Sequence, residues 1–132
     1  MPTQNVWDAA FAGNARDVHR AVDCGAEPDA YDKSGQTALH KATVNGHVDC
    51  MEALEERGWD LNKPDQSGCA ALHIAAKSGH RRAVEWLVER GANLRVKSKK
   101  GNTARAMAEK AGHMEIHKYL QDKEREKYGN VL

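Results

Sequence analysis

The 132-residue sequence predicts an all-α solenoid that forms a single domain, residues 1–132. The first observation behind this prediction is a repeat of 33 residues, and the second is a helix–turn–helix pattern with a short hairpin-like turn inside each repeat. One such hairpin cannot bury its apolar face alone, so neighbouring repeats are expected to stack around a continuous core. Three series of glycines share the spacing: Gly13, Gly46, Gly79 and Gly112; Gly25, Gly58 and Gly91; and Gly35, Gly68 and Gly101.

Each repeat begins with a turn followed by a short helix. Residues 32–35 have the sequence Asp-Lys-Ser-Gly, which is typical of a turn whose glycine adopts a backbone angle that other residues resist. Thr37 follows at a position where its hydroxyl can cap the first helix. That helix is small and apolar, with Ala38, Leu39 and Ala42, so neighbouring helices are expected to approach closely.

The second helix of each repeat is amphipathic, and a glycine ends it. Met51 and Leu54 show the three-residue spacing of one helix face, and Gly58 follows. The two ends of the chain carry more polar residues, as terminal repeats of a solenoid require. The expected units are residues 4–31 and 98–121 as terminal repeats, 32–64 and 65–97 as complete repeats, and 122–132 as a charged C-terminal tail.

The pattern Asp-x-x-Gly-x-Thr-Ala-Leu-His-x-Ala, followed by Asn-Gly-His and then Gly-Ala, resembles the ankyrin repeat. The resemblance covers about residues 4–121. It implies a non-catalytic scaffold or inhibitor that binds another protein, and it implies that His40 and His73 bond backbone and threonine around the turn. The chain departs from the family pattern at several positions: alanine at 38, 71 and 104 in place of proline, Arg105 in place of leucine, and Ser98 in place of the turn aspartate.

The overall charge of +1 conceals an asymmetry between the two halves of the chain. Residues 1–66 hold 6 basic and 12 acidic side chains, for a net charge of −6, and residues 67–132 hold 14 and 7, for a net charge of +7. No secretory signal is recognisable at the N-terminus, and the three cysteines form no CxxC pair. We therefore expect reduced thiols in a cytoplasmic or nuclear protein that is not secreted.

Seven histidines and three cysteines raise the questions of a metal site and of catalysis. Zinc sites need ligands at short, defined spacings, whereas these histidines recur at two repeat positions, so we expect no metal and no cofactor. Cys69 is the best candidate nucleophile, because it is expected in the exposed turn with His73 on the adjoining helix. Small residues that fill small spaces explain the cysteines better, and the prediction is that the protein is not an enzyme.

A basic cluster around the last turn favours an alternative function. Lys97, Lys99, Lys100 and their neighbours Arg95 and Arg105 form the positive patch that nucleic acid or an anionic lipid surface requires. Base-stacking aromatic residues are not interleaved with these charges. Binding of nucleic acid or anionic lipid through this basic face therefore stays the alternative.

The resemblance places a partner on the concave face formed by the turn tips and the lip of the first helices. This face is expected to be apolar at its N-terminal end and rich in lysine at its C-terminal end, which suits a partner segment with an apolar anchor beside acidic residues. The predicted partner-binding residues are Phe11, Tyr31, Lys33, Gln36, Val44, Asn45, Gln66, Cys69, Lys77, Lys97, Lys99, Lys100, Asn102 and Lys110.

Three aromatic residues lie on the other side of the repeats. Trp59, Trp86 and Tyr119 are expected to be partly buried between second helices; exposed together, they would form a second interface. The protein is expected to be monomeric, although its acidic and basic halves also suit head-to-tail self-association.

Overall fold

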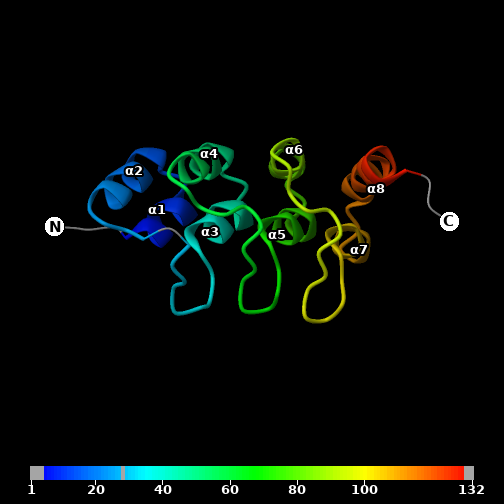
Figure 1. Cartoon of the computed structure of the whole chain (residues 1–132), viewed down its shortest axis with the longest axis horizontal. Coiled ribbons are helices and arrows are strands. Elements are labelled where there is room, and N and C mark those ends of the chain that lie inside the picture. The colour runs from blue at the N-terminus through cyan, green and yellow to red at the C-terminus, as the bar shows by residue number, and fades with distance from the viewer. Residues whose placement is uncertain (1–4, 28, 130–132) are drawn as a thin grey trace.

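The computed structural model describes residues 5–27 and 29–129. This part of the chain contains eight helices and no strand, arranged as four antiparallel pairs that stack side by side from the N-terminus to the C-terminus (Figure 1). The predicted all-α solenoid is confirmed. None of the described helices is long and apolar enough to cross a membrane.

The first helices of the four pairs form an inner row. Each of them packs against the next, and their contact surfaces are lined with buried alanines such as Ala9, Ala42 and Ala75, which allow close approach. Thr37 and Thr103 cap two of these helices with their hydroxyls, as the sequence predicts. The row consists of α1 (Val6–Ala12), α3 (Ala38–Val44), α5 (Ala71–Ser78) and α7 (Ala104–Lys110).

The second helices form an outer row that covers one side of the inner row (Figure 1). Their apolar faces contribute the largest buried side chains, including Met51, Leu54 and Leu87, to the shared core. The predicted helix-ending glycines 25, 58 and 91 all have positive φ. The row consists of α2 (Ala15–Asp23), α4 (Val48–Glu56), α6 (Arg81–Glu89) and α8 (Met114–Tyr128).

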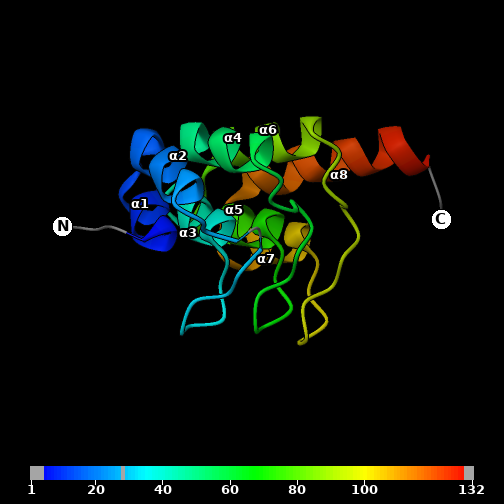
Figure 2. The ribbon, with the colours of Figure 1, turned by 60° about the vertical axis from the view of Figure 1, so that its left-hand side comes forward.

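Three hairpin turns project from the inner row on the same side of the molecule (Figures 1 and 2). Within the first, the backbone N–H of Asp32 donates to the carbonyl of Gln36 at 2.9 Å. Neighbouring hairpins are joined to one another as well, because the N–H of Gln66 donates to the carbonyl of Gly35 at 3.1 Å. A similar bond joins the second and third hairpins, where the N–H of Lys99 donates to the carbonyl of Ser67.

Two buried histidines hold the hairpins onto the helices. The Nδ1 atom of His40 accepts a hydrogen bond from the N–H of Thr37 at 2.9 Å, so its Nε2–H donates to the carbonyl of Lys63 at 2.9 Å. His73 repeats the arrangement one unit later, with the N–H of Ala70 as donor. The implied bonds to backbone and threonine are present at His40, whereas His73 bonds only the backbone because Ala70 stands in place of the threonine. Each imidazole also ties its helix to the loop that leads into the next hairpin.

The aromatic residues of the outer side are packed into the repeats. Trp59 and Trp86 are only 3% and 8% exposed, and Tyr119 is half-buried with the guanidinium of Arg81 over its ring. The expectation of partial burial holds, and these rings do not form an exposed aromatic patch.

The C-terminal segment differs from the expected charged tail. Residues 122–128 continue α8, while residues 130–132 lie outside the described part of the chain. Glu124 pairs with Arg105 of α7 at 3.0 Å, and the ring of Tyr128 packs against the core under the guanidinium of Arg95. The charged pattern of this segment thus belongs to a helix that covers the end of the stack.

Candidate functional site

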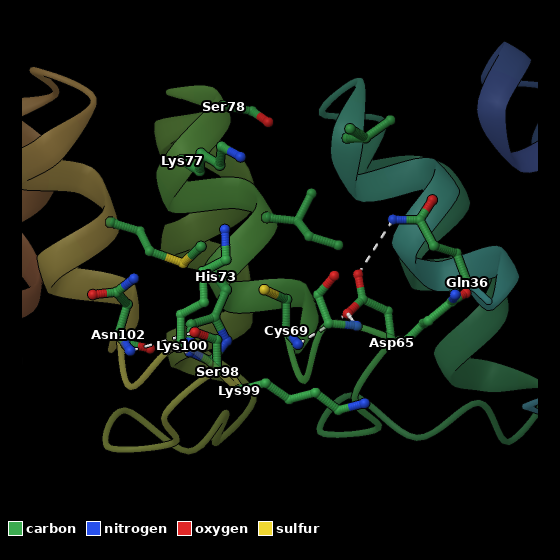
Figure 3. A pocket seen from close by; sticks show the side chains of 15 residues that line it. Gln36, Asp65, Cys69, His73, Lys77, Ser78, Ser98, Lys99, Lys100 and Asn102 are labelled. Carbon is green, nitrogen blue, oxygen red and sulfur yellow. Dashed lines mark hydrogen bonds between the residues drawn. The ribbon is translucent and has the colours of Figure 1, made fainter. Parts of the chain in front are cut away.

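The hairpin turns and the inner helices together form one side of the molecule, the concave face (Figure 2). Between the second and third hairpins this face is hollowed into a groove of about 640 Å³. Its walls come from hairpin residues 65–69 and 98–102, and its floor comes from α5 and α7 (Figure 3). The groove is open to solvent on one side rather than enclosed.

The groove brings together more than half of the predicted partner-binding residues. They come from three successive units, so only stacking of the repeats places them side by side. Those that line the groove are Gln36, Val44, Gln66, Cys69, Lys77, Lys99, Lys100 and Asn102. Lys110 lies next to them, because its Nζ donates to the Asn102 side-chain oxygen at 2.9 Å.

The remaining predicted residues lie elsewhere. Phe11 is 50% exposed at the end of α1, where the side-chain amide of Asn45 donates to its carbonyl at 2.8 Å. Tyr31 and Lys33 line a second hollow at the N-terminal end, and the Tyr31 hydroxyl donates to the carbonyl of Pro64. Lys97 is exposed but lines neither the groove nor this hollow.

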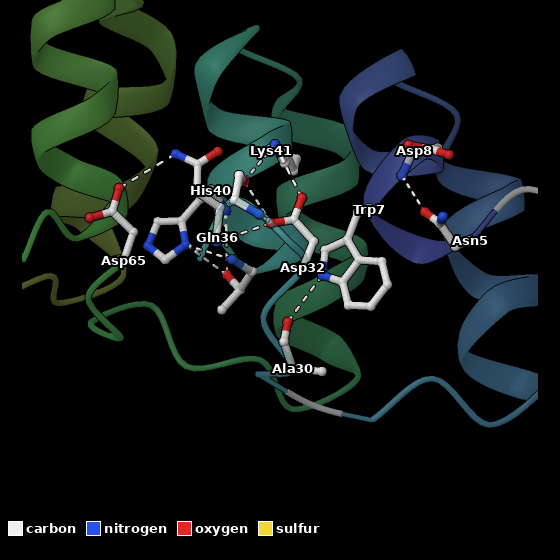
Figure 4. Close-up of polar contacts among 11 residues, drawn as sticks. Asn5, Trp7, Asp8, Ala30, Asp32, Gln36, His40, Lys41 and Asp65 are labelled. Carbon is white, nitrogen blue, oxygen red and sulfur yellow. Dashed lines mark hydrogen bonds and ion pairs between the residues drawn. The ribbon is translucent and has the colours of Figure 1, made fainter. Parts of the chain in front are cut away.

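A tryptophan of the N-terminal hollow was missed at the sequence level. Trp7 lines the hollow beside Tyr31, and its indole N–H donates to the carbonyl of Ala30 at 3.0 Å (Figure 4). No signal in the spacing of the repeats marked it as a surface residue.

The sequence-based prediction also missed two apolar residues on the groove floor. Ile74 and Met107 both line the groove, and they occupy one repeat position, 33 residues apart. The same position holds Lys41 in the second unit, where its ammonium pairs with Asp32 at 3.2 Å (Figure 4). Comparing this position across the units would have shown the change from charged to apolar side chains.

The lysines of the groove differ from the cations of the outer row. Within residues 5–27 and 29–129, no carboxylate oxygen lies within 4.0 Å of the ammonium groups of Lys77, Lys99 or Lys100. On the outer row, in contrast, Arg57 and Arg90 pair with carboxylates of the preceding unit. Positive charge on the concave face is therefore left without an internal partner.

Cys69 does not lie in an exposed position, and the expectation that it does is wrong. Its side chain is 9% exposed at the base of the groove, and burial, followed by the nearby Asp65 carboxylate, raises the pKa of its thiol. Both nitrogens of His73 are occupied by backbone groups, and burial lowers the pKa of its imidazole. A nucleophile needs a base that faces it, and this pair lacks that arrangement.

Two further histidines make hydrogen bonds between units. The Nε2 atom of His80 lies 3.0 Å from the carbonyl of Val44, and that of His113 lies 3.1 Å from the carbonyl of Lys77. A carbonyl accepts only, so each imidazole donates. In the described part of the chain, no group of three or more His, Cys, Asp or Glu side chains is arranged to hold a metal ion.

The turn aspartate of the second unit has an unusually low pKa. Burial would raise it, but hydrogen bonds from Ser34, Gln36 and Lys41 outweigh burial and hold the pKa of Asp32 at about 2. The carboxylate is therefore ionised at neutral pH, and it accepts the hydrogen bonds that hold the first hairpin together beside the concave face (Figure 4).

The chain was compared with known proteins. The family model described as "Ankyrin repeats (3 copies)" matches residues 6–98. The "Ankyrin repeat-containing protein P1E11.10" of Schizosaccharomyces pombe is 42% identical over 60 residues, which is 46% of this chain and 29% of that protein. The chain thus spans less than a third of the length of this relative.

The family match covers most of the chain, and the helix pairs and hairpins of the structure continue past Ser98 into the last unit. The chain therefore belongs to the ankyrin repeat family, whose members generally bind other proteins and are generally non-catalytic.

Proposed function

We propose that this protein is a non-catalytic scaffold or inhibitor that binds one partner protein through its concave face. The observation that carries the proposal is the groove, where lysines without an internal partner lie beside apolar side chains. An interface of this kind combines desolvated apolar contacts with charges that steer association. The partner would be met in the cytoplasm or the nucleus, where reduced thiols such as the exposed Cys24 persist.

The composition of the groove favours a protein over nucleic acid or anionic lipid. Single-stranded nucleic acid binds to grooves whose positive charge is combined with aromatic stacking surfaces, and no Phe, Tyr or Trp side chain lines this groove. The carboxylate of Asp65 also lies in the groove wall and would repel a phosphate backbone. An apolar floor made of Ile74 and Met107 has no counterpart in a phosphate chain.

Affinity capture from a lysate tests this function. We expect the wild-type protein to retain a specific partner protein, and both Phe11→Ala and the double variant Lys99→Gln/Lys100→Gln to retain much less of it. The control is Arg82→Gln/Lys118→Gln, which removes the same amount of charge from exposed positions on the outer helices α6 and α8.

A partner captured equally by all variants would show that the concave face is not the binding surface. Capture of RNA or of anionic vesicles in place of a protein, with binding that fades steeply as salt rises, would favour the basic-face alternative.

A further inference from the structure

Two neighbouring positions of the inner helices change character along the solenoid in opposite directions. One position is apolar in the first two units and cationic in the last two. The other position, three residues earlier on the same helix, is charged in the first two units and apolar in the last two. The first series is Phe11, Val44, Lys77 and Lys110, and the second is Asp8, Lys41, Ile74 and Met107.

The apolar members of the two series form an oblique stripe across the inner row. Because residues three apart lie on the same helix face, the stripe shifts by one helical turn between Val44 and Ile74. Val44, Ile74 and Met107 line the same groove, and Phe11 is exposed at the N-terminal end of the stripe. Packed helix axes lie about 8–10 Å apart, so a stripe over four helices spans roughly 25–30 Å.

Lysines border the groove on both sides of this apolar floor. Lys77 lies toward the end of α5 above the floor, whereas Lys99 and Lys100 lie on the hairpin below it (Figure 3). Lys110, at the end of α7, reaches the third hairpin, where its Nζ donates to the Asn102 side-chain oxygen. A ligand that fits must therefore present an apolar strip with negative charge along both of its edges.

An α-helix meets this requirement better than an extended segment. In an extended chain, successive side chains point to opposite faces, so acidic residues between apolar anchors would point away from the lysines. In a helix, apolar residues at positions i, i+3, i+4 and i+7 form a strip, and the flanking positions place carboxylates on both sides of it. A strip of roughly 27 Å corresponds to about 18 helical residues.

We propose that the concave face binds an amphipathic α-helix of the partner protein, with a leucine-rich strip in the groove and acidic residues along both edges. This proposal rests on the proposed protein-binding function and specifies the partner's element. Asp65 lies on the second hairpin, so the carboxylates of the partner helix would concentrate near Lys77 of α5 and near the lysines of the third hairpin.

Binding of designed peptides to the whole chain tests the proposal. The probe is a fluorescein-labelled peptide of about 18 residues with leucines on one helix face and glutamates on both flanks. Its matched controls are a scrambled peptide of the same composition and a version with the glutamates replaced by lysines. We expect fluorescence anisotropy to give dissociation constants at least about tenfold larger for both control peptides than for the leucine peptide.

The substitution Ile74→Lys removes part of the apolar floor, and its melting curve shows whether the fold tolerates a lysine at this position, which is only 8% exposed. Lys41 occupies this position in the second unit, where it contacts Asp32 and Ser34. The third unit offers Asp65 and Ser67 at the matching turn positions, so the introduced ammonium finds equivalent partners. We expect about tenfold weaker binding of the leucine peptide, while the control Met114→Lys, an exposed methionine of α8, leaves binding unchanged.

Several results would overturn the proposal while leaving protein binding as such intact. One is equal binding of the amphipathic and scrambled peptides, which would mean that charge alone is recognised. Another is unchanged affinity in Ile74→Lys when its melting curve matches that of the wild type. Failure of the leucine peptide to bind below about 1 mM would also overturn it. Tighter binding of an oligoribonucleotide of similar length would overturn the protein-binding function together with the helix proposal. The proposed function fails separately, if the captured partner ignores the concave-face variants or if RNA or anionic vesicles are captured in place of a protein.

Discussion

The imidazole of His80 lies directly against Gly46 of the preceding unit, so close that a Cβ built on Gly46 would be 2.8 Å from the ring. The same contact joins Gly13 with His47 and Gly79 with His113. The recurring glycine thus serves two purposes, because it adopts a positive φ after the first helix and leaves room for the histidine of the next unit. The recurring histidine of one unit thus contacts the recurring glycine of the preceding unit.

We predict that Gly46→Ala destabilises the protein more than Gly112→Ala. Both residues have positive φ, but a Cβ on Gly112 would meet no atom of the described residues within 4 Å. The loss of unfolding free energy should be about 1 kcal/mol for Gly112→Ala and about 2–3 kcal/mol for Gly46→Ala. Urea unfolding followed by circular dichroism measures both, and equal losses would mean that the histidine shifts aside freely.

The low pKa of Asp32 predicts a stability contribution that disappears in acid. The pKa in the folded state is about 2 against 3.8 for the free group, so the unfolded chain takes up the proton first as the pH falls. The contribution is complete above about pH 4 and is lost as the pH falls through about 2. Asp32→Ala should therefore cost about 2 kcal/mol at neutral pH.

Urea unfolding at pH 7, 4 and 2.5 checks this expectation. The gap in unfolding free energy between Asp32→Ala and the wild type should be similar at the first two values and smaller at the third. If the difference in unfolding free energy between the two proteins did not change with pH, the charge of the Asp32 carboxylate would not contribute to stability.

The buried histidines predict a second, milder pH dependence. Burial lowers the pKa of His40 and of His73 below 6.5, so below that pH the unfolded chain binds protons that the folded chain resists. Stability should fall as the pH drops from 7 to 5, with each histidine contributing up to about 1.4 kcal/mol per pH unit. His73→Gln should reduce this slope even though it lowers stability overall. An unchanged slope in unfolding experiments across this range would contradict the expectation.

The C-terminal part of α8 should stabilise the last unit. Tyr128 packs on the core under Arg95, whose guanidinium lies 3.8 Å from the ring centre. Tyr128→Ala should lower the unfolding free energy by about 1–2 kcal/mol through lost apolar contact and lost cation–π attraction. Arg125→Ala, an exposed residue of the same helix, is the control and should change stability little. If Tyr128→Ala melted at the same temperature as Arg125→Ala and the wild type, the Tyr128 side chain would contribute nothing to the stability of the fold.

The local features of the fold were predictable because they depend on residues close together in the chain. The capping hydroxyl of Thr37 and the positive φ of Gly58 each follow from a short segment with one low-energy conformation. The length of α8 was not predictable in this way. Residues 122–128 have the charge pattern of a solvated tail, and their helix is stabilised by Arg105 and Arg95 of earlier elements.

The candidate site was predictable as a list of positions but not as a surface. The sequence indicated which residues face the partner, yet it placed Cys69 in an exposed turn and assigned the apolar character to the region around Phe11. In the structure, Cys69 is 9% exposed at the base of the groove, and Ile74 and Met107 supply an apolar floor beside the lysines. Neither outcome can be deduced from one unit, because each wall of the groove belongs to a different repeat.

The sequence by itself determined the 33-residue period, the order of turn and helices within it, and the opposite charges of the two halves. These properties depend on local backbone preferences and on composition, and both follow from the residues of each unit taken separately. Only the tertiary structure decided which side chains meet between units: the ring of His80 on Gly46, and the groove between the second and third hairpins. The physical reason is that stacking brings residues 33 positions apart into contact, and the chemistry of a contact depends on both partners.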